Sequence, residues 1–116
     1  MLVLGSSVLI AAGCSSMKTP ATASVAVSTA AVDSAAGAGG AEFAPVEMSS
    51  ARNKMAWANK AMADKDYKLA NDWAIQAQAD AALAQGKANS AKAKIAADAL
   101  QDDVRVLREE LGRISK

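Results

Sequence analysis

The fold is decided by one continuous stretch, Met48 to Ala88, which reads MSSARNKMAWANKAMADKDYKLANDWAIQAQADAALAQGKA. Alanine and methionine recur in it every three or four residues, the spacing that places side chains on one face of an α-helix. In the middle, the polar run ADKDY interrupts this pattern. The stretch therefore predicts two amphipathic helices joined by a tight turn, which makes them antiparallel neighbours.

The first of these helices is expected to begin at Pro45, because proline suits the first turn of a helix, and to end near Ala63. Its apolar face would carry Met48, Ala51, Met55, Ala58 and Met62. Asp66 follows the helix and can cap the next one, which would begin at Tyr67. Its carboxylate accepts hydrogen bonds from free backbone amides and suits the positive end of the helix dipole.

The second helix is expected to run from Tyr67 to about Leu111, since no proline interrupts it. Its length would be about 65 to 70 Å. A seam of small residues at nearly heptad spacing matches the face of the first helix. This seam comprises Ala70, Ala74, Ala77, Ala81, Ala84, Ala88, Ala91 and Ile95. The predicted fold is all-α: an antiparallel helical hairpin with a short first helix and a long second helix.

The last part of the long helix carries a second apolar stripe in a different phase. It comprises Ala93, Ala97, Leu100, Val104, Leu107, Leu111 and Ile114. The first helix is too short to cover it, so the five large members, from Leu100 onward, form a possible interaction stripe. A second copy in a coiled coil or a helix of another protein would cover them; alternatively, this end frays in solution. Pairs four residues apart, Arg105 with Glu109 and Glu109 with Arg113, would support the helix.

Near the amino end, a short apolar run, LVLGSSVLIAA (residues 2–12), precedes Gly13 and Cys14. The run has the length of a signal-peptide core and is too short to span a bilayer. The sequence AAGC resembles the lipobox of bacterial lipoproteins, which implies that residues 1–13 are cleaved and that Cys14 is lipidated. A multiply acylated cysteine gives lasting membrane attachment. The alternative is that Cys14 is a buried apolar residue of an ordinary helix.

Two features of this segment depart from the lipobox pattern. Ala11 stands where a leucine is usual, and no lysine or arginine precedes the apolar run. Because export signals begin with basic residues, we expect the signal to be truncated here and the native start to lie upstream. The resemblance also implies a location. In lipoproteins, a serine such as Ser15 after the cysteine, instead of an aspartate, favours sorting to the outer membrane. We therefore expect the protein to be lipid-anchored on the periplasmic face of the outer membrane.

Residues 14–44 are expected to be the lipidated cysteine and a flexible linker, followed by a helical hairpin domain at 45–116. The linker contains mainly serine, threonine, alanine, glycine and valine, which bury too little surface to offset the entropy of ordering. As a random coil it would reach about 30 Å. The alternative is a weak β segment at Ser24 to Val32.

Composition argues against several functions. The chain has no histidine, one cysteine and a net charge of +1, so it lacks the usual proton shuttle and an internal disulfide. The chain has no basic patch with stacking aromatic residues, so nucleic acid is not an expected partner. We expect no enzyme activity, no cofactor and no metal; Asp98 and Asp102 share a helix face but are expected to be solvated. Trp57, Tyr67 and Trp73 are expected to plug the closed end of the hairpin rather than stack on a ligand.

Two resemblances extend this interpretation. Ala44 to Leu111 resembles domain-of-unknown-function family 4398, found in lipoproteins and periplasmic proteins of Gram-negative bacteria. The features that carry the likeness are Pro45, Ser49-Ser50-Ala51-Arg52, Asp66-Tyr67-Lys68-Leu69-Ala70 and the alanine-rich stretch from Gln76 to Ala84. The resemblance implies place and shape without naming a reaction.

The final Lys116 is similar to the terminal lysine of the major murein type of lipoprotein, which can be joined to peptidoglycan. The expected function is that of a membrane-anchored periplasmic lipoprotein acting as a non-catalytic structural or protein-interaction module of the cell envelope. The alternative is an envelope tether attached to peptidoglycan through Lys116.

Overall fold

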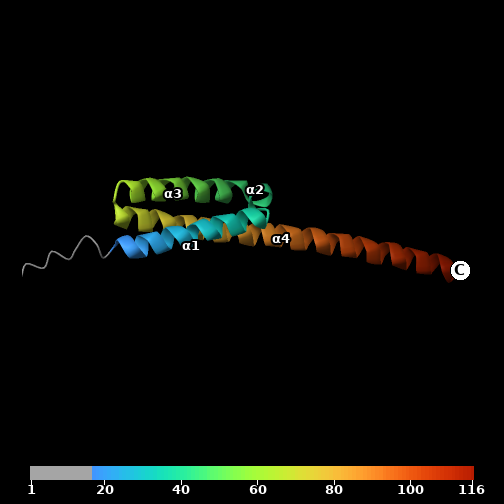
Figure 1. Ribbon diagram of the computed structural model, residues 1–116. Helices are drawn as coiled ribbons and strands as arrows, with labels where there is room; N and C mark the ends of the chain where they lie inside the picture. The colour runs from blue at the N-terminus through green and yellow to red at the C-terminus, as the bar shows by residue number, and fades with distance from the viewer. Residues whose placement is uncertain (1–16) are drawn as a thin grey trace, which may run out of the picture.

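The computed structural model describes residues 17–116, and within them every regular element is a helix. The elements are α1 (Lys18–Gly37), α2 (Gly40–Phe43), α3 (Pro45–Ala63) and α4 (Tyr67–Ile114). Figure 1 shows α1 and α3 lying beside the first half of α4, while the second half of α4 extends alone. The prediction of an all-α fold with a long last helix is confirmed.

The turn between α3 and α4 follows the expected chemistry. Pro45 stands at the first position of α3, and the helix ends at Ala63. Lys65 then takes a positive φ of 61°, which reverses the chain. The Asp66 side chain caps α4, its Oδ1 accepting a hydrogen bond from the Leu69 amide at 3.1 Å. The predicted boundaries of these two helices are therefore correct, except that α4 continues three residues further, to Ile114.

The predicted flexible linker is wrong from Lys18 onward, because α1 occupies most of it. The weak β segment at Ser24 to Val32 is wrong as well, since these residues lie inside α1. The buried residues of α1 are Ala21, Ser28, Val32 and Ala35. Small residues bury little surface in isolation, but alanine favours the helix and packing against neighbouring helices stabilises it. The molecule is a bundle of α1, α3 and the first half of α4, and the second half of α4 projects from it. The predicted hairpin of α3 and α4 is therefore only part of the fold.

Side-chain contacts give the direction of α1. Near its start, Ser24 donates a hydrogen bond to Asn71 at 2.6 Å, and near its end Ser34 accepts one from Gln85 at 3.2 Å. Residue numbers rise together in the two helices, so α1 runs parallel to α4. Because the turn makes α3 antiparallel to α4, α1 and α3 are also antiparallel. The start of α1 therefore lies at the closed end of the α3–α4 pair (Figure 1).

The glycines that follow α1 form a tight connection to α3. Gly39 adopts a φ of +91°, a left-handed conformation that favours glycine. A Cβ on Gly40 would lie 2.7 Å from the Ala35 carbonyl oxygen and 2.9 Å from Met48 Sδ. This part of the predicted linker is thus a close turn whose shape requires glycine.

The alanine seam of α4 forms the centre of the bundle. Its fully buried members are Ala70, Ala74, Ala77, Ala81, Ala84 and Ala88. The predicted seam ends early, because Ala91 is only half-buried and Ile95 is 58% exposed. On α3 the predicted face is buried up to Ala58, after which Ala61 is buried and Met62 is half-buried. Helix α4 leaves the bundle after Ala88, where its neighbours end.

Candidate interaction surface

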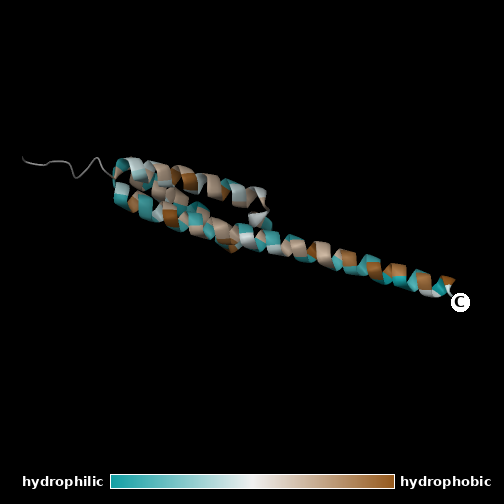
Figure 2. Ribbon diagram, turned by 90° about the horizontal axis from the view of Figure 1, so that it is seen from below, coloured by the Kyte–Doolittle hydropathy of each residue, from teal (hydrophilic) through white to brown (hydrophobic). Residues whose placement is uncertain are grey.

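The second half of α4 presents an apolar face that no other described residue covers. The exposed fractions are 64% for Leu100, 37% for Val104, 59% for Leu107, 65% for Leu111 and 82% for Ile114. Figure 2 shows hydrophobic residues recurring along this projecting part of the helix, between hydrophilic ones. We call these five residues the C-terminal stripe. Their exposure agrees with the prediction that the first helix of the hairpin, α3, does not cover them.

A shallow groove runs beside the C-terminal stripe. It is lined by Leu100, Gln101, Val104, Arg105, Arg108 and Glu109, all on α4. A small-molecule site needs walls from several sides, and a single helix supplies only one. The groove is therefore suited to side chains of a second helix rather than to an enclosed ligand.

Ion pairs along the projecting half join successive turns of the same helix. Arg105 contacts Glu109 at 3.2 Å, as predicted, and Asp102 at 3.7 Å. The predicted pair between Glu109 and Arg113 is not among the ion pairs of the described residues, so that prediction is wrong. Arg105 and its partners support the isolated helix.

The carboxylates of Asp98 and Asp102 lie beside basic side chains of the same helix. Lys94 pairs with Asp98 at 2.7 Å, and Arg105 lies near Asp102. Over residues 17–116, no group of three histidine, cysteine, aspartate or glutamate side chains is placed to hold a metal ion. The two carboxylates are part of the charged surface of α4.

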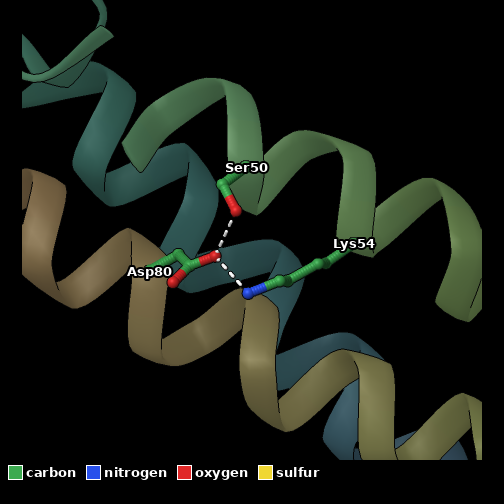
Figure 3. Close-up of polar contacts among 3 residues, drawn as sticks. All are labelled: Ser50, Lys54 and Asp80. Carbon is green, nitrogen blue, oxygen red and sulfur yellow. Dashed lines mark hydrogen bonds and ion pairs between the residues drawn. The ribbon is translucent and has the colours of Figure 1, made fainter. Parts of the chain in front are cut away.

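A polar cluster that sequence reasoning missed joins α3 to α4. Ser50 and Lys54 of α3 both donate hydrogen bonds to Asp80 Oδ2 of α4, at 2.6 and 2.7 Å (Figure 3). Burial on its own raises the pKa of Asp80, but the hydrogen bonds from Lys54 and Ser50 and the charge of Lys54 outweigh it, so the pKa is lowered. The one signal in the sequence was a lone acidic residue inside an alanine-rich stretch. The cluster fixes the register of the two helices.

Two further charged contacts involve lysines of α4, one between helices and one within α4. Lys87 of α4 donates a hydrogen bond to Glu47 of α3, and this bond lowers the pKa of the Glu47 carboxyl. On α4, a hydrogen bond to Asp72 at 2.8 Å raises the pKa of Lys68. Both contacts hold charged groups in their ionised forms. They stabilise the helices.

The aromatic residues divide into two places. Trp57 of α3 and Trp73 of α4 contact each other edge to face, with ring centroids 4.7 Å apart and an interplanar angle of 60°. Trp57 is 48% exposed, so the pair lies at the surface. Tyr67 packs elsewhere, against a small cluster of buried alanines at the closed end. The prediction of a single three-residue plug is therefore wrong.

Two predicted site residues are not tested by the geometry. Cys14, with the predicted signal at 1–13, lies outside the described residues. Lys116 is exposed beyond the end of α4. Over residues 17–116, no helix has both the length and the apolar character needed to cross a membrane.

Comparison with known proteins gives a family. The family model described as Domain of unknown function (DUF4398) matches residues 23–100, more than half of the chain. The match begins inside α1, which agrees with a folded unit that includes this helix, and it ends at Leu100 in the C-terminal stripe. No curated protein and no solved structure matches the chain.

Proposed function

The chain belongs to the family described as Domain of unknown function (DUF4398), and we propose that it is a lipid-anchored protein of the bacterial envelope. In this proposal, lipidated Cys14 holds the protein on the periplasmic face of the outer membrane. The role is structural: the bundle presents the projecting half of α4 to another helix. The proposal assigns no reaction and no cofactor.

The exposed C-terminal stripe is the observation that carries this proposal. Five large aliphatic side chains are between 37% and 82% exposed on a helix that has left its bundle. Surface apolar residues occur singly in most proteins, but a continuous row of them is typical of an interface. An interaction module is the function that this surface supports best.

The bundle begins close to the proposed membrane anchor. Lys18, where α1 begins, is four positions after Cys14, and the chain between the two residues can span at most about 14 Å. The start of α1 shares the closed end of the bundle with the α3–α4 turn, through contacts of Ala21 with Ala61 and Ala70. That end would therefore lie close to the bilayer. The C-terminal stripe is at the opposite end of α4, a helix about 72 Å long.

Labelling with radioactive palmitate tests the anchor. The chain, expressed from its native gene in a Gram-negative bacterium, should incorporate label and sediment with the outer membrane. The Cys14→Ser variant should lose both properties, whereas the neighbouring Ser16→Ala variant should keep both. Equal labelling of Cys14→Ser and the unaltered protein would contradict the proposal, and so would an unlabelled protein in the cytosol.

A second proposal is a tether to peptidoglycan through Lys116. Its support is the exposure of Lys116 beyond α4, at the end of the helix that is remote from the bundle. Deletion of Lys116 should then remove the protein from purified cell-wall material. An unchanged amount of wall-bound protein after the deletion would rule this attachment out.

A further inference from the structure

The exposed face of α4 follows an uninterrupted heptad repeat. Counting through Ala93 to Ile114, heptad position a is occupied by Ala97, Val104 and Leu111, and position d by Ala93, Leu100, Leu107 and Ile114. A β-branched residue at a next to leucine at d favours two parallel strands. Val104, with Leu100 and Leu107 on either side, has this combination. The stripe thus has the pattern of a two-stranded coiled coil.

The same repeat continues backward along the bundle. The preceding a and d positions are Ser90, Gly86, Leu83 and Ala79, and all four are exposed. A Cβ on Gly86 would meet nothing within 4 Å, so this side of α4 is open. From Ala79 to Ile114 the repeat is about five heptads long, whereas three to four are enough to indicate a coiled coil.

Helices α1 and α3 do not block this face. An α-helix turns by about 100° per residue, and over the bundle this places the face from Ala79 to Ser90 roughly opposite the buried alanine seam. Since α1 and α3 pack on the seam, a second helix can approach from the other side. Two bundles can therefore lie on the outside of a central pair of α4 helices.

Charges beside the stripe distinguish the possible orientations. Position g carries Asp103 and Glu110, whereas position e carries Lys94 and Arg108. In a parallel, in-register pair, g faces e of the next heptad in the other copy, so Asp103 would face Arg108. In an antiparallel pair, g faces g and e faces e, which brings like charges together. Within residues 17–116, neither Asp103 nor Arg108 forms an ion pair in the isolated chain.

We propose that the projecting half of α4 pairs with the same segment of a second copy in a parallel, in-register coiled coil. This inference rests on the proposed function, since it names the partner of the same surface. A common membrane anchor also favours it, because two copies attached through Cys14 to one bilayer start from the same side. The groove lined by Leu100, Val104 and Arg108 then receives side chains of the second copy.

Charge reversal in the full chain tests both the pairing and its orientation. The starting protein carries Cys14→Ser, which removes the acylation site and the only thiol, and its dimer dissociation constant is measured by sedimentation equilibrium. Asp103→Arg should weaken the dimer roughly ten-fold, because two attractive pairs become repulsive. Adding Arg108→Asp should restore the dimer to within about three-fold of the starting protein. Asp102→Arg, at the outward position f, is the matched control and should have little effect.

Three results would contradict the proposed pairing. A dimer that Asp103→Arg leaves unchanged or tightens would overturn the inference, because Asp103 would then not face Arg108 of the other copy. A protein that stays monomeric up to high micromolar concentration would overturn it as well, and so would failure of the double variant to recover.

Disulfide trapping gives a second measurement of the register. In the same background, Leu107→Cys places a thiol at position d, opposite its counterpart in a parallel, in-register pair. Mild oxidation should convert most of this variant to a covalent dimer, while Val106→Cys, on the outer face, should stay largely monomeric. Equal cross-linking of both variants would contradict the register.

The outcome of these experiments does not depend on the proposed membrane anchor. They use acyl-free protein in solution, so a negative palmitate result would leave a measured dimer in place. Conversely, a labelled, membrane-bound protein that shows none of the expected charge effects would retain the anchor and lose the coiled coil.

Discussion

Ser28 Oγ donates a hydrogen bond of 2.6 Å to the carbonyl oxygen of Ala74, and neither residue is exposed to solvent. The bond joins the middle of α1 to α4 at a point where both side chains are small. Close approach of the two helices is possible because a serine and an alanine meet there. A buried hydroxyl without a partner costs free energy, so this bond favours one register of α1 on α4.

Replacement of Ser28 measures how firmly α1 is held. Ser28→Ala should lower the free energy of unfolding by about 0.5 to 1.5 kcal/mol through loss of the bond. Ser28→Val should cost more, about 1 to 3 kcal/mol, because the larger side chain has no room. Urea denaturation followed by circular dichroism provides the measurement. The control is Thr29→Ala, exposed on the same helix, and an equal effect there would show that α1 does not pack as described.

The alanine seam should tolerate no enlargement. Ala77 has no exposed surface, so Ala77→Leu must push α1 or α3 away from α4. The expected loss is about 1 to 3 kcal/mol or more, seen as a lower urea midpoint. Ala82→Leu makes the same chemical change on the exposed side of α4 and should alter stability by about 0.5 kcal/mol or less. If Ala82→Leu lowered the stability more than Ala77→Leu, the buried seam would lie on the other face of α4.

The two patterned helices could be predicted from sequence because their signals are local. Pro45, the cap at Asp66 and the spacing of the buried alanines depend on residues near one another in the chain. Helix α1 has no comparable signal. Its serines, valines and alanines resemble a linker by composition, and they form a helix through contacts such as Ser28 with Ala74, 46 residues apart. Such long-range packing is invisible to periodicity.

The Asp80 cluster gives the protein a pH dependence. The folded state lowers the pKa of Asp80 below its ordinary value of 3.8, so this carboxylate stabilises the fold above that value. The stabilisation is lost as the pH falls through the lowered pKa of the folded state. Asp80→Asn should cost about 1 kcal/mol at pH 7 and progressively less below about pH 4. Denaturation curves at several pH values measure this difference.

A matched variant separates Asp80 from the general effect of acid. Asp33→Asn removes an exposed carboxylate from α1 and should change stability little at any pH. If the cost of Asp80→Asn were the same at pH 7 and at pH 2.5, the ion pair with Lys54 would not account for its contribution.

Two glycines should respond oppositely to alanine. Gly86 lies in α4 with open space around its Cβ position, so Gly86→Ala should stabilise dilute, monomeric protein by about 0.5 to 1 kcal/mol. Gly40→Ala should destabilise it, because the added Cβ would lie 2.7 Å from the Ala35 carbonyl oxygen. Thermal denaturation of both variants gives the comparison. A stabilising Gly40→Ala would show that the α1–α3 connection is loose.

The candidate surface was partly predictable. The C-terminal stripe follows from spacing alone, since a row of large aliphatics three and four residues apart lies on one face of any helix. The Ser50–Lys54–Asp80 cluster was not predictable, because it requires the register of α3 on α4. The surface position of Trp57 and Trp73 was not predictable for the same reason. Features set by one helix were accessible to sequence, and those set by two helices were not.

Backbone hydrogen exchange at two protein concentrations tests the central claim that the projecting half of α4 is an unfilled interface. Amides from Ala74 to Ala88 lie in the bundle and should be protected equally at both concentrations. Amides from Leu100 to Ile114 should exchange rapidly in dilute protein and at least ten-fold more slowly at a concentration where dimers prevail. Exchange of this segment at the same rate at all concentrations would contradict the account.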